Sequence, residues 1–170
     1  MGKASPGGGK VFGKWGDRMN LTDEQYMRQA LQLAEVAYQK GEVPVGALLV
    51  GETGVISQAY NRCEELCDAT AHAEMLVLQE GGRSLGSWRL LNTTLYVTLE
   101  PCPMCAGAMV HARVSRLVFG TRDPKGGAVG SLYNIPTDPR LNHRLEVHEG
   151  VLALECSTLL KNFFSERRGQ

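Results

Sequence analysis

The chain has 170 residues, the length of one ordinary domain, with 43% hydrophobic and 21% charged residues, as in folded globular proteins. Its formal net charge is zero, which argues against a large non-specific basic surface, so any nucleic acid that the chain binds should bind through a local patch. No apolar stretch is long enough for a transmembrane helix. The five cysteines, an odd number, favour a reducing compartment over a disulfide framework. We therefore expect a cytoplasmic protein that does not bind membranes.

Residues 1–20 differ in composition from the rest of the chain. They are rich in glycine and lysine and lack the apolar run of a signal peptide. We expect a disordered extension or a scar left by cloning, with a weak RNA-contacting arm as the alternative. Residues 21–170 then form the folded domain.

The first half of the domain predicts a helix, a hairpin and a second helix. Thr22 and Gln25 match a capping box, and apolar residues recur at helical spacing as far as Gly41, which predicts a helix over residues 22–40. Two apolar runs, 44–50 and 55–61, flank a turn and predict paired strands. After the polar stretch 62–68, Thr70 is expected to cap a helix that ends near residue 80.

The second half alternates strands with helices around one long loop. The predicted elements are a strand over 94–99, a helix over 101–111, a strand over 116–120, a loop over 124–139, a strand over 145–151 and a helix over 152–168. A Gly- and Pro-rich loop of that length is usually functional or disordered. The order of elements indicates an α/β fold, a mixed sheet covered by helices on both faces.

Cys102 and Cys105 are the first pair of candidate metal ligands. Three residues apart on a helix, they lie on one face. Pro101 and Pro103 suit the first turn of a helix, so both thiols should lie near a helix N-terminus. The helix dipole there favours the thiolate, which is the form that binds metal.

His72 can complete a three-ligand zinc site. Three protein ligands leave a fourth position for water, which distinguishes catalytic from structural zinc, and the ion lowers the pKa of that water from about 15.7 to about 7. Glu74 lies two residues from His72, so both can face one metal only if His72 stands at or before the first turn. Glu74 would then reach the water as a proton carrier.

Each half of this motif alone is weak evidence for a zinc site. A lone C-x-x-C pair could be a redox motif or half of a zinc ribbon, and H-x-E carries little information. Together, H-x-E at 72–74 and P-C-x-x-C at 101–105 are far more specific. We therefore expect one catalytic Zn²⁺ per subunit.

Longer stretches carry a family resemblance. The chain resembles the bacterial tRNA adenosine deaminases of the cytidine deaminase-like zinc superfamily over residues 21–168. The matching segments include 42–47, 60–62, 70–74, 95–102, 105–109, 118–120, 130–132 and 142–144, with Phe163-Phe164 and Arg167-Arg168 near the end. The resemblance implies a three-layer α-β-α fold with five strands in the order 2-1-3-4-5, the last three parallel. It also implies a homodimer on which tRNA spans both subunits.

The resemblance also assigns roles. It implies that zinc-activated water converts adenosine to inosine at wobble position 34 of a tRNA anticodon stem-loop, tRNA(Arg) with the anticodon ACG above all. Zinc would be held by His72, Cys102 and Cys105, with Glu74 carrying protons. Asn61 would hydrogen-bond the flipped base, Val43 and Pro44 would wall its pocket, and Asp123 would lie beside the ribose and anticodon backbone.

Further RNA contacts are candidates on charge and shape. They are Arg122, Lys125, Arg167 and Arg168, with Phe164 available to stack on a base. Each has a simpler interpretation. Asp123 before Pro124 could be a turn residue, the two terminal arginines could be a solvated helix end, and either Phe163 or Phe164 belongs to the core.

Two rival functions remain open at this point. The chain could deaminate a free nucleobase or nucleoside, such as guanine or cytosine, with the same chemistry. It could also be a zinc-stabilised RNA-binding module without catalysis, although Glu74 beside an open metal position argues against that.

Overall fold

The computed structural model describes residues 15–170, with side chains from residue 23 onward. Its helices are α1 (Trp15–Gln39), α2 (Cys63–Leu66), α3 (Ala73–Leu85), α4 (Pro103–His111) and α5 (Ala153–Arg168). Its strands are β1 (Gly46–Gly51), β2 (Gly54–Tyr60), β3 (Thr94–Leu99), β4 (Arg116–Thr121) and β5 (Glu146–Glu149). Within this part of the chain, no helix combines the length and the apolarity that crossing a bilayer demands.

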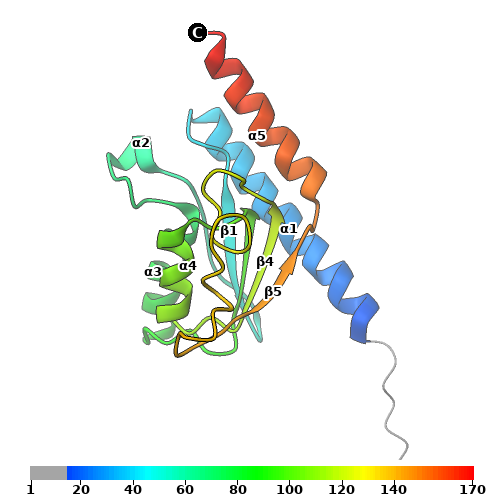
Figure 1. Cartoon of the computed structure of the whole chain (residues 1–170), viewed down its shortest axis with the longest axis vertical. Coiled ribbons are helices and arrows are strands. Elements are labelled where there is room, and N and C mark those ends of the chain that lie inside the picture. Colours follow the sequence, from blue (N-terminus) through cyan, green and yellow to red (C-terminus); the bar gives the residue numbers. More distant parts are fainter. Residues whose placement is uncertain (1–14) are drawn as a thin grey trace, which may run out of the picture.

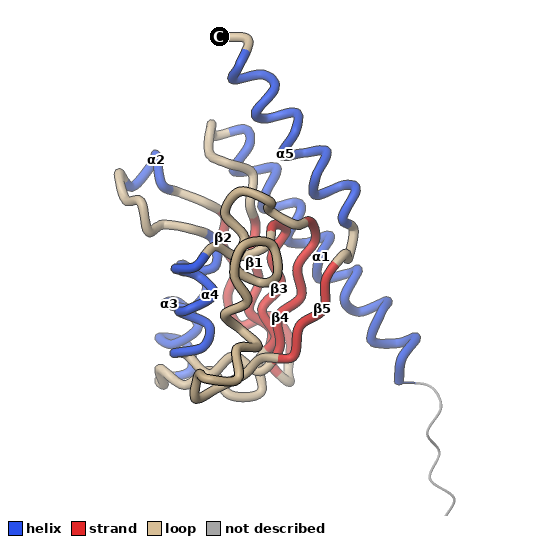
Figure 2. Tube along the Cα trace, in the orientation of Figure 1, coloured by secondary structure: helices blue, strands red, loops and turns tan. Residues whose placement is uncertain are grey.

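The five strands form one mixed sheet in the order β2-β1-β3-β4-β5 (Figure 2). β1 pairs antiparallel with both β2 and β3. β3, β4 and β5 are mutually parallel, with Leu95 opposite Leu117 and Leu117 opposite Val147. The predicted order and the parallel arrangement of the last three strands are confirmed.

Helices cover both faces of this sheet. Figure 1 shows α3 and α4 on one side and α1 and α5 on the other. Alternate residues of a strand point to opposite faces, so Leu49 packs in one cluster with Val77 and Met109, whereas Leu48 packs in the other with Met27. The expected three-layer architecture is therefore present.

Two predicted helix caps are wrong. α1 begins at Trp15, so Thr22 lies inside the helix and does not cap it. Residues three apart are neighbours within a helix as well, so the Thr22–Gln25 spacing alone does not mark a helix start. α3 begins at Ala73 with His72 at its N-cap. The Thr70 hydroxyl and amide instead both donate to Oδ1 of Asp68, at 2.7 and 2.8 Å, in a local turn that competes with helix capping.

Other boundaries move by a few residues. Residues 15–20 of the expected extension belong to α1, and residues 1–14 lie outside the described part of the chain. The polar stretch 62–68 contains the one-turn helix α2, α3 continues to Leu85, and α4 begins at Pro103 instead of Pro101. β5 is shorter than predicted, at Glu146–Glu149.

The predicted long loop is present and extends further than expected. The chain between β4 and β5 contains neither helix nor strand, apart from one bridge between Val129 and Asn134. Because β4 and β5 are parallel, the chain must return across the sheet between them, and this loop makes that return.

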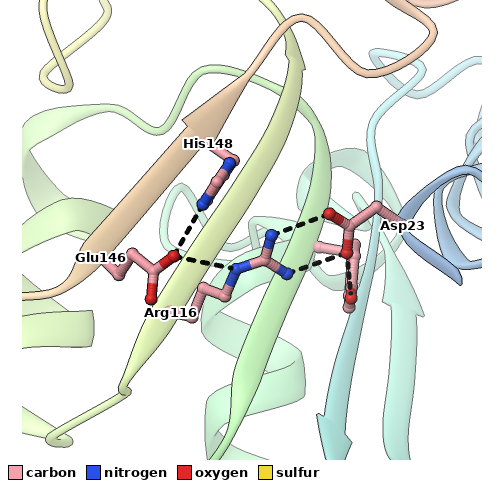
Figure 3. Close-up of polar contacts among 5 residues, drawn as sticks. Asp23, Arg116, Glu146 and His148 are labelled. Atoms are coloured by element: carbon pink, nitrogen blue, oxygen red, sulfur yellow. Dashed lines mark hydrogen bonds and ion pairs between the residues drawn. The ribbon is translucent and has the colours of Figure 1, made fainter. Parts of the chain in front are cut away.

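A buried ion pair fastens α1 to the sheet (Figure 3). Nη1 and Nη2 of Arg116 donate to the two carboxylate oxygens of Asp23, each at 2.8 Å. The Tyr96 hydroxyl donates to the same carboxylate at 2.7 Å. On the other side, Nε of Arg116 lies 3.8 Å from Glu146, which also pairs with His148. The network thereby joins α1 to three neighbouring strands.

Candidate active site

The three predicted metal ligands come together in the structure. Nδ1 of His72 lies 3.7 Å from Sγ of Cys102 and 3.5 Å from Sγ of Cys105. All three ligand atoms lie within 4.8 Å of one another. Cys105 is fully buried, and the other two residues are half-buried.

These separations fit a zinc ion. Tetrahedral zinc with Zn–S bonds of about 2.3 Å and Zn–N bonds of about 2.0 Å requires ligand atoms roughly 3.5–3.8 Å apart. The two measured nitrogen-to-sulfur distances fall in that range. One imidazole nitrogen and two thiols also form a donor set that zinc prefers over magnesium or calcium.

Two helix N-termini supply the ligands. His72 is the N-cap of α3 and Cys102 is the N-cap of α4, both with extended backbone angles, and Cys105 is the third residue of α4. The Cys105 thiol, the dominant influence, and His72 hydrogen-bond to Cys102 and lower its pKa to about 4. The same contact raises the pKa of Cys105. One metal-binding thiolate is thus favoured before any ion arrives.

Glu74 lies beside these ligands as the second residue of α3. Its side chain is buried, with 4% of the residue exposed, and burial raises the pKa of its carboxyl to about 7. The condition derived from the H-x-E spacing is met, because His72 precedes the first helical turn. A carboxyl with a pKa near neutrality can both accept and donate a proton.

The three predicted pocket residues lie at one end of the β1–β2 hairpin. Val43 and Pro44 lie two to three residues before β1, and Asn61 directly follows β2. The backbone N–H of Asn61 donates to the carbonyl of Val45 at 3.1 Å. Its side-chain oxygen accepts a hydrogen bond at 2.8 Å from the backbone N–H of Ala73, the residue between His72 and Glu74. Asn61 is therefore locked to the helix start that carries the site.

The candidate RNA contacts in the long loop have intramolecular partners. Arg122 forms a two-pronged ion pair with Glu149, with both distances 2.8 Å. The Asp123 carboxylate accepts from the backbone N–H groups of Lys125 and Gly126, which is the local turn geometry considered in its simpler interpretation. Lys125 is exposed.

The candidates in α5 divide between the core and the surface. Phe163 is 4% exposed and belongs to the core, whereas Phe164 is 46% exposed. The Arg167 guanidinium lies 4.4 Å from the Phe163 ring centroid and donates to the carbonyl of Gly41. Arg168 is exposed at the end of the helix.

Sequence reasoning missed two buried carboxylates that hold loops around the site. Glu42 accepts the backbone N–H groups of Glu64 and Glu65 at 3.2 and 2.8 Å, which fixes the segment leading to His72. Glu100, two residues before Cys102, accepts donors from the long loop. The available signal was an acidic residue directly bordering an apolar strand, where burial requires hydrogen-bond partners.

Known proteins resemble this chain over the region that contains the site. The family described as the cytidine and deoxycytidylate deaminase zinc-binding region matches residues 20–121, a span that contains His72, Glu74, Cys102 and Cys105. The tRNA-specific adenosine deaminase of Bacillus subtilis is 53% identical over 86% of this chain and 91% of its own length. That of Haemophilus influenzae is 52% identical over 86% of this chain and 85% of its own length.

Solved structures agree with the sequence relatives. A structure from a study of A-to-I editing by tRNA:A34 deaminases superposes with a TM-score of 0.77 at 44% identity, covering 80% of this chain and 99% of the other. The long loop lies outside the family match at 20–121, but a match over 146 of the 170 residues necessarily includes it. The chain belongs to the cytidine and deoxycytidylate deaminase family, within its group of tRNA-specific adenosine deaminases.

Proposed function

We propose that the protein hydrolytically deaminates adenosine to inosine at wobble position 34 of a tRNA anticodon, with tRNA(Arg) carrying ACG as the foremost substrate. The observation that carries the proposal is the buried Glu74 carboxyl beside the His72, Cys102 and Cys105 ligand set. This arrangement occurs in a chain 53% identical to a tRNA-specific adenosine deaminase. The five free thiols among the described residues accord with action in the cytoplasm.

The chemistry divides between the metal and one carboxylate. When bound, zinc would act as a Lewis acid and lower the pKa of a water molecule, which makes that water a strong enough nucleophile to attack a carbon at neutral pH. Glu74 takes the proton from that water as its oxygen bonds to C6 of adenine, and delivers the proton to N1. Glu74 then carries the remaining proton of the new C6 hydroxyl to the amine. The C6–N bond breaks as the C6=O bond forms, so that one water is consumed and one ammonia is released.

Position equips Glu74 for both transfers. Burial raises the pKa of its carboxyl, and the side chain lies beside the residues that would hold the zinc. Its place in the first turn of α3 fixes it next to the ligands. The same group can therefore act as base and as acid in one turnover.

Asn61 would recognise the base. Its side-chain oxygen is committed to the Ala73 N–H, so its Nδ2 hydrogens are the donors that remain for an acceptor nitrogen of the purine. Half-buried Val43 and buried Pro44 offer an apolar wall for the ring. A base in a single-stranded anticodon loop reaches such a pocket at lower cost than one in a duplex.

The RNA backbone would be held by the long loop and by α5. Arg122, Asp123 and Lys125 follow β4 directly, and Phe164, Arg167 and Arg168 lie in the last turns of α5. Arg122 can exchange Glu149 for a phosphate because their ion pair is half exposed, and exposed pairs are weak. Phe164 offers an exposed ring for stacking.

A second copy of the chain would cover an apolar groove next to the site. The groove has a volume of about 550 Å³ and lies between α3 and α4, with Met75, Ala108, Ala112 and Trp88 among its lining residues. Trp88 is 60% exposed, which is unusual for a large aromatic side chain outside an interface. We propose a homodimer through this face, so that tRNA can span both subunits.

Ammonia release tests the proposed function against its rivals. Zinc-loaded protein is incubated with an ACG anticodon stem-loop and, separately, with adenosine, cytidine and guanine. Ammonia from the stem-loop alone supports the proposal. Release from a free base or nucleoside instead identifies a different deaminase, and binding of the stem-loop without ammonia identifies a non-catalytic RNA-binding module.

A further inference from the structure

Glu100 is a buried carboxylate, 2% exposed, at the junction between β3 and the zinc-binding segment. It takes no part in the chemistry described above. Its backbone N–H donates to the Thr121 carbonyl at 2.8 Å, which places its side chain beside the start of the long loop. A buried charge in this position requires an unusually complete set of hydrogen-bond partners.

The long loop provides four such partners. Oε1 of Glu100 accepts the Asp123 N–H at 3.1 Å and the Ser131 hydroxyl. Oε2 accepts the N–H groups of Val129 and Ser131 at 3.0 and 3.1 Å. A carboxylate has about four lone-pair sites and donates nothing, so its capacity matches these donors one for one. The segment 123–131 is thus wrapped around a single side chain.

Gly127 shows how close this packing is. A Cβ atom built on Gly127 would meet both oxygens and the carboxyl carbon of Glu100 well inside van der Waals contact. Every residue except glycine would therefore push the loop away from the carboxylate. Glycine is therefore the residue that the close approach of the loop to Glu100 requires at position 127.

The contacts between Glu100 and the loop lie next to the metal ligands. The carbonyl of Pro101, between Glu100 and Cys102, accepts the Ala128 N–H at 2.8 Å. Glu100 and Pro101, in the short segment between β3 and α4, thus hold the loop, and the next residue, Cys102, is a metal ligand of the proposed zinc site. A displacement of the loop from Glu100 alters where Asp123 stands relative to Cys102.

We propose that Glu100 is a positioning residue for RNA binding, which sets segment 122–131 against the zinc site so that Arg122, Asp123 and Lys125 meet the polynucleotide next to the reacting base. The inference rests on the proposed function, because it concerns the binding of a tRNA loop. Glu100 acts through the loop and touches neither the base nor the metal.

Substitutions at Glu100 and at its loop contacts separate an effect on RNA binding from an effect on the chemical step. Glu100→Gln replaces one acceptor oxygen with an NH2 group that faces two donors, and Gly127→Ala leaves the carboxylate intact but pushes the loop off it. For both variants we expect KM for the ACG stem-loop to rise roughly tenfold or more, with kcat within about threefold of wild type and zinc retained. Ser131→Ala removes the hydroxyl, one of the two donors that Ser131 supplies to Glu100, and keeps the backbone N–H, so it should raise KM less.

Glu52→Gln is the matched control, because Glu52 is an exposed glutamate in the β1–β2 turn and should leave both constants unchanged. Kinetics are measured together with zinc content by mass spectrometry.

An unchanged KM in Gly127→Ala and Ser131→Ala overturns the inference, even if Glu100→Gln fails to fold. Loss of zinc, or a fall in kcat without a rise in KM, also overturns it and makes Glu100 a support for the metal site. A wild-type protein inactive on the stem-loop instead overturns the proposed function, and the inference with it.

Discussion

Nδ1 of His72 lies 3.5 Å from Sγ of Cys105, although 33 residues separate them in the chain. They meet because α3 and α4 lie side by side on one face of the sheet and begin at the same end (Figure 1). The ligand set therefore exists only in the folded protein, and metal binding is coupled to the fold.

Loss of one thiol should remove the metal. Cys102→Ser replaces the thiolate at the N-cap of α4 with a hydroxyl that does not ionise at neutral pH and binds zinc poorly. We expect zinc to fall from about one ion per chain to less than about a tenth, with activity lost in proportion. Mass spectrometry of the purified protein measures the metal. Cys156→Ser, which changes a buried thiol outside the ligand set, is the control and should retain zinc.

Loss of the proton carrier should leave the metal in place. Glu74→Gln keeps the size of the side chain but replaces the carboxylate with an amide that cannot take up a proton, so kcat should fall by roughly 10²- to 10⁴-fold. Zinc content should match wild type, because the three ligands are untouched. A variant with near-normal turnover would show that another group moves the protons.

The ion pair between Asp23 and Arg116 should contribute to stability in a pH-dependent way. Burial opposes ionisation of Asp23, but hydrogen bonds from Arg116 and Tyr96 outweigh it, so the pKa of this carboxyl is lowered in the folded protein. Its stabilising contribution is fully present above the unfolded-state pKa of about 3.9 and is lost as pH falls through the lower folded-state pKa. Asp23→Asn should lower the free energy of unfolding at pH 7 by about 3 kcal/mol.

Urea unfolding of both proteins between pH 7 and pH 3 measures this contribution. The difference between wild type and Asp23→Asn should be constant from pH 7 to about pH 5 and should shrink below about pH 4. Glu80→Gln breaks an exposed ion pair with Arg83 and should cost less than about 1 kcal/mol at any pH. A stability difference between wild type and Asp23→Asn that grows on acidification would contradict the role assigned to the ion pair.

The apolar groove between α3 and α4 should be required for dimerisation. Trp88→Glu places a charge where the second copy would bury an aromatic ring, and should weaken self-association at least roughly 100-fold. Light scattering across a range of protein concentrations reports the mass. Leu154→Glu, at an apolar residue of α5 that is 75% exposed on the other layer, should leave the mass unchanged. A monomeric wild type would contradict the proposed dimer.

Local patterns in the sequence predicted the five strands, the long loop and the complete ligand set, through apolar strand runs, helix-start prolines and short motifs whose residue types match one metal. The order of the strands in the sheet came instead from the family resemblance. The requirement that His72 precede a helical turn followed from the spacing to Glu74 and is met in the structure. The expected one buried, one exposed arrangement of Phe163 and Phe164 is also present.

The remaining features depend on tertiary contacts that no local pattern encodes. Thr70 is a good capping residue, but its hydroxyl has a nearer partner in Asp68. Arg122 carries the charge expected of an RNA contact, yet in the structure it pairs with Glu149, 27 residues away. The role of Glu100 is visible only when its four donors from the folded loop are known.

Position-specific detection of inosine tests the central claim most directly. Full-length tRNA(Arg) with the anticodon ACG is incubated with the zinc-loaded protein and sequenced after reverse transcription, which reads inosine as guanosine. A tRNA(Arg) with guanosine at position 34 serves as the control. We expect conversion at A34 and at no other adenosine, with none in the control or in the Glu74→Gln variant. An A34 that stays unconverted while free nucleosides or other adenosines are deaminated would contradict the account.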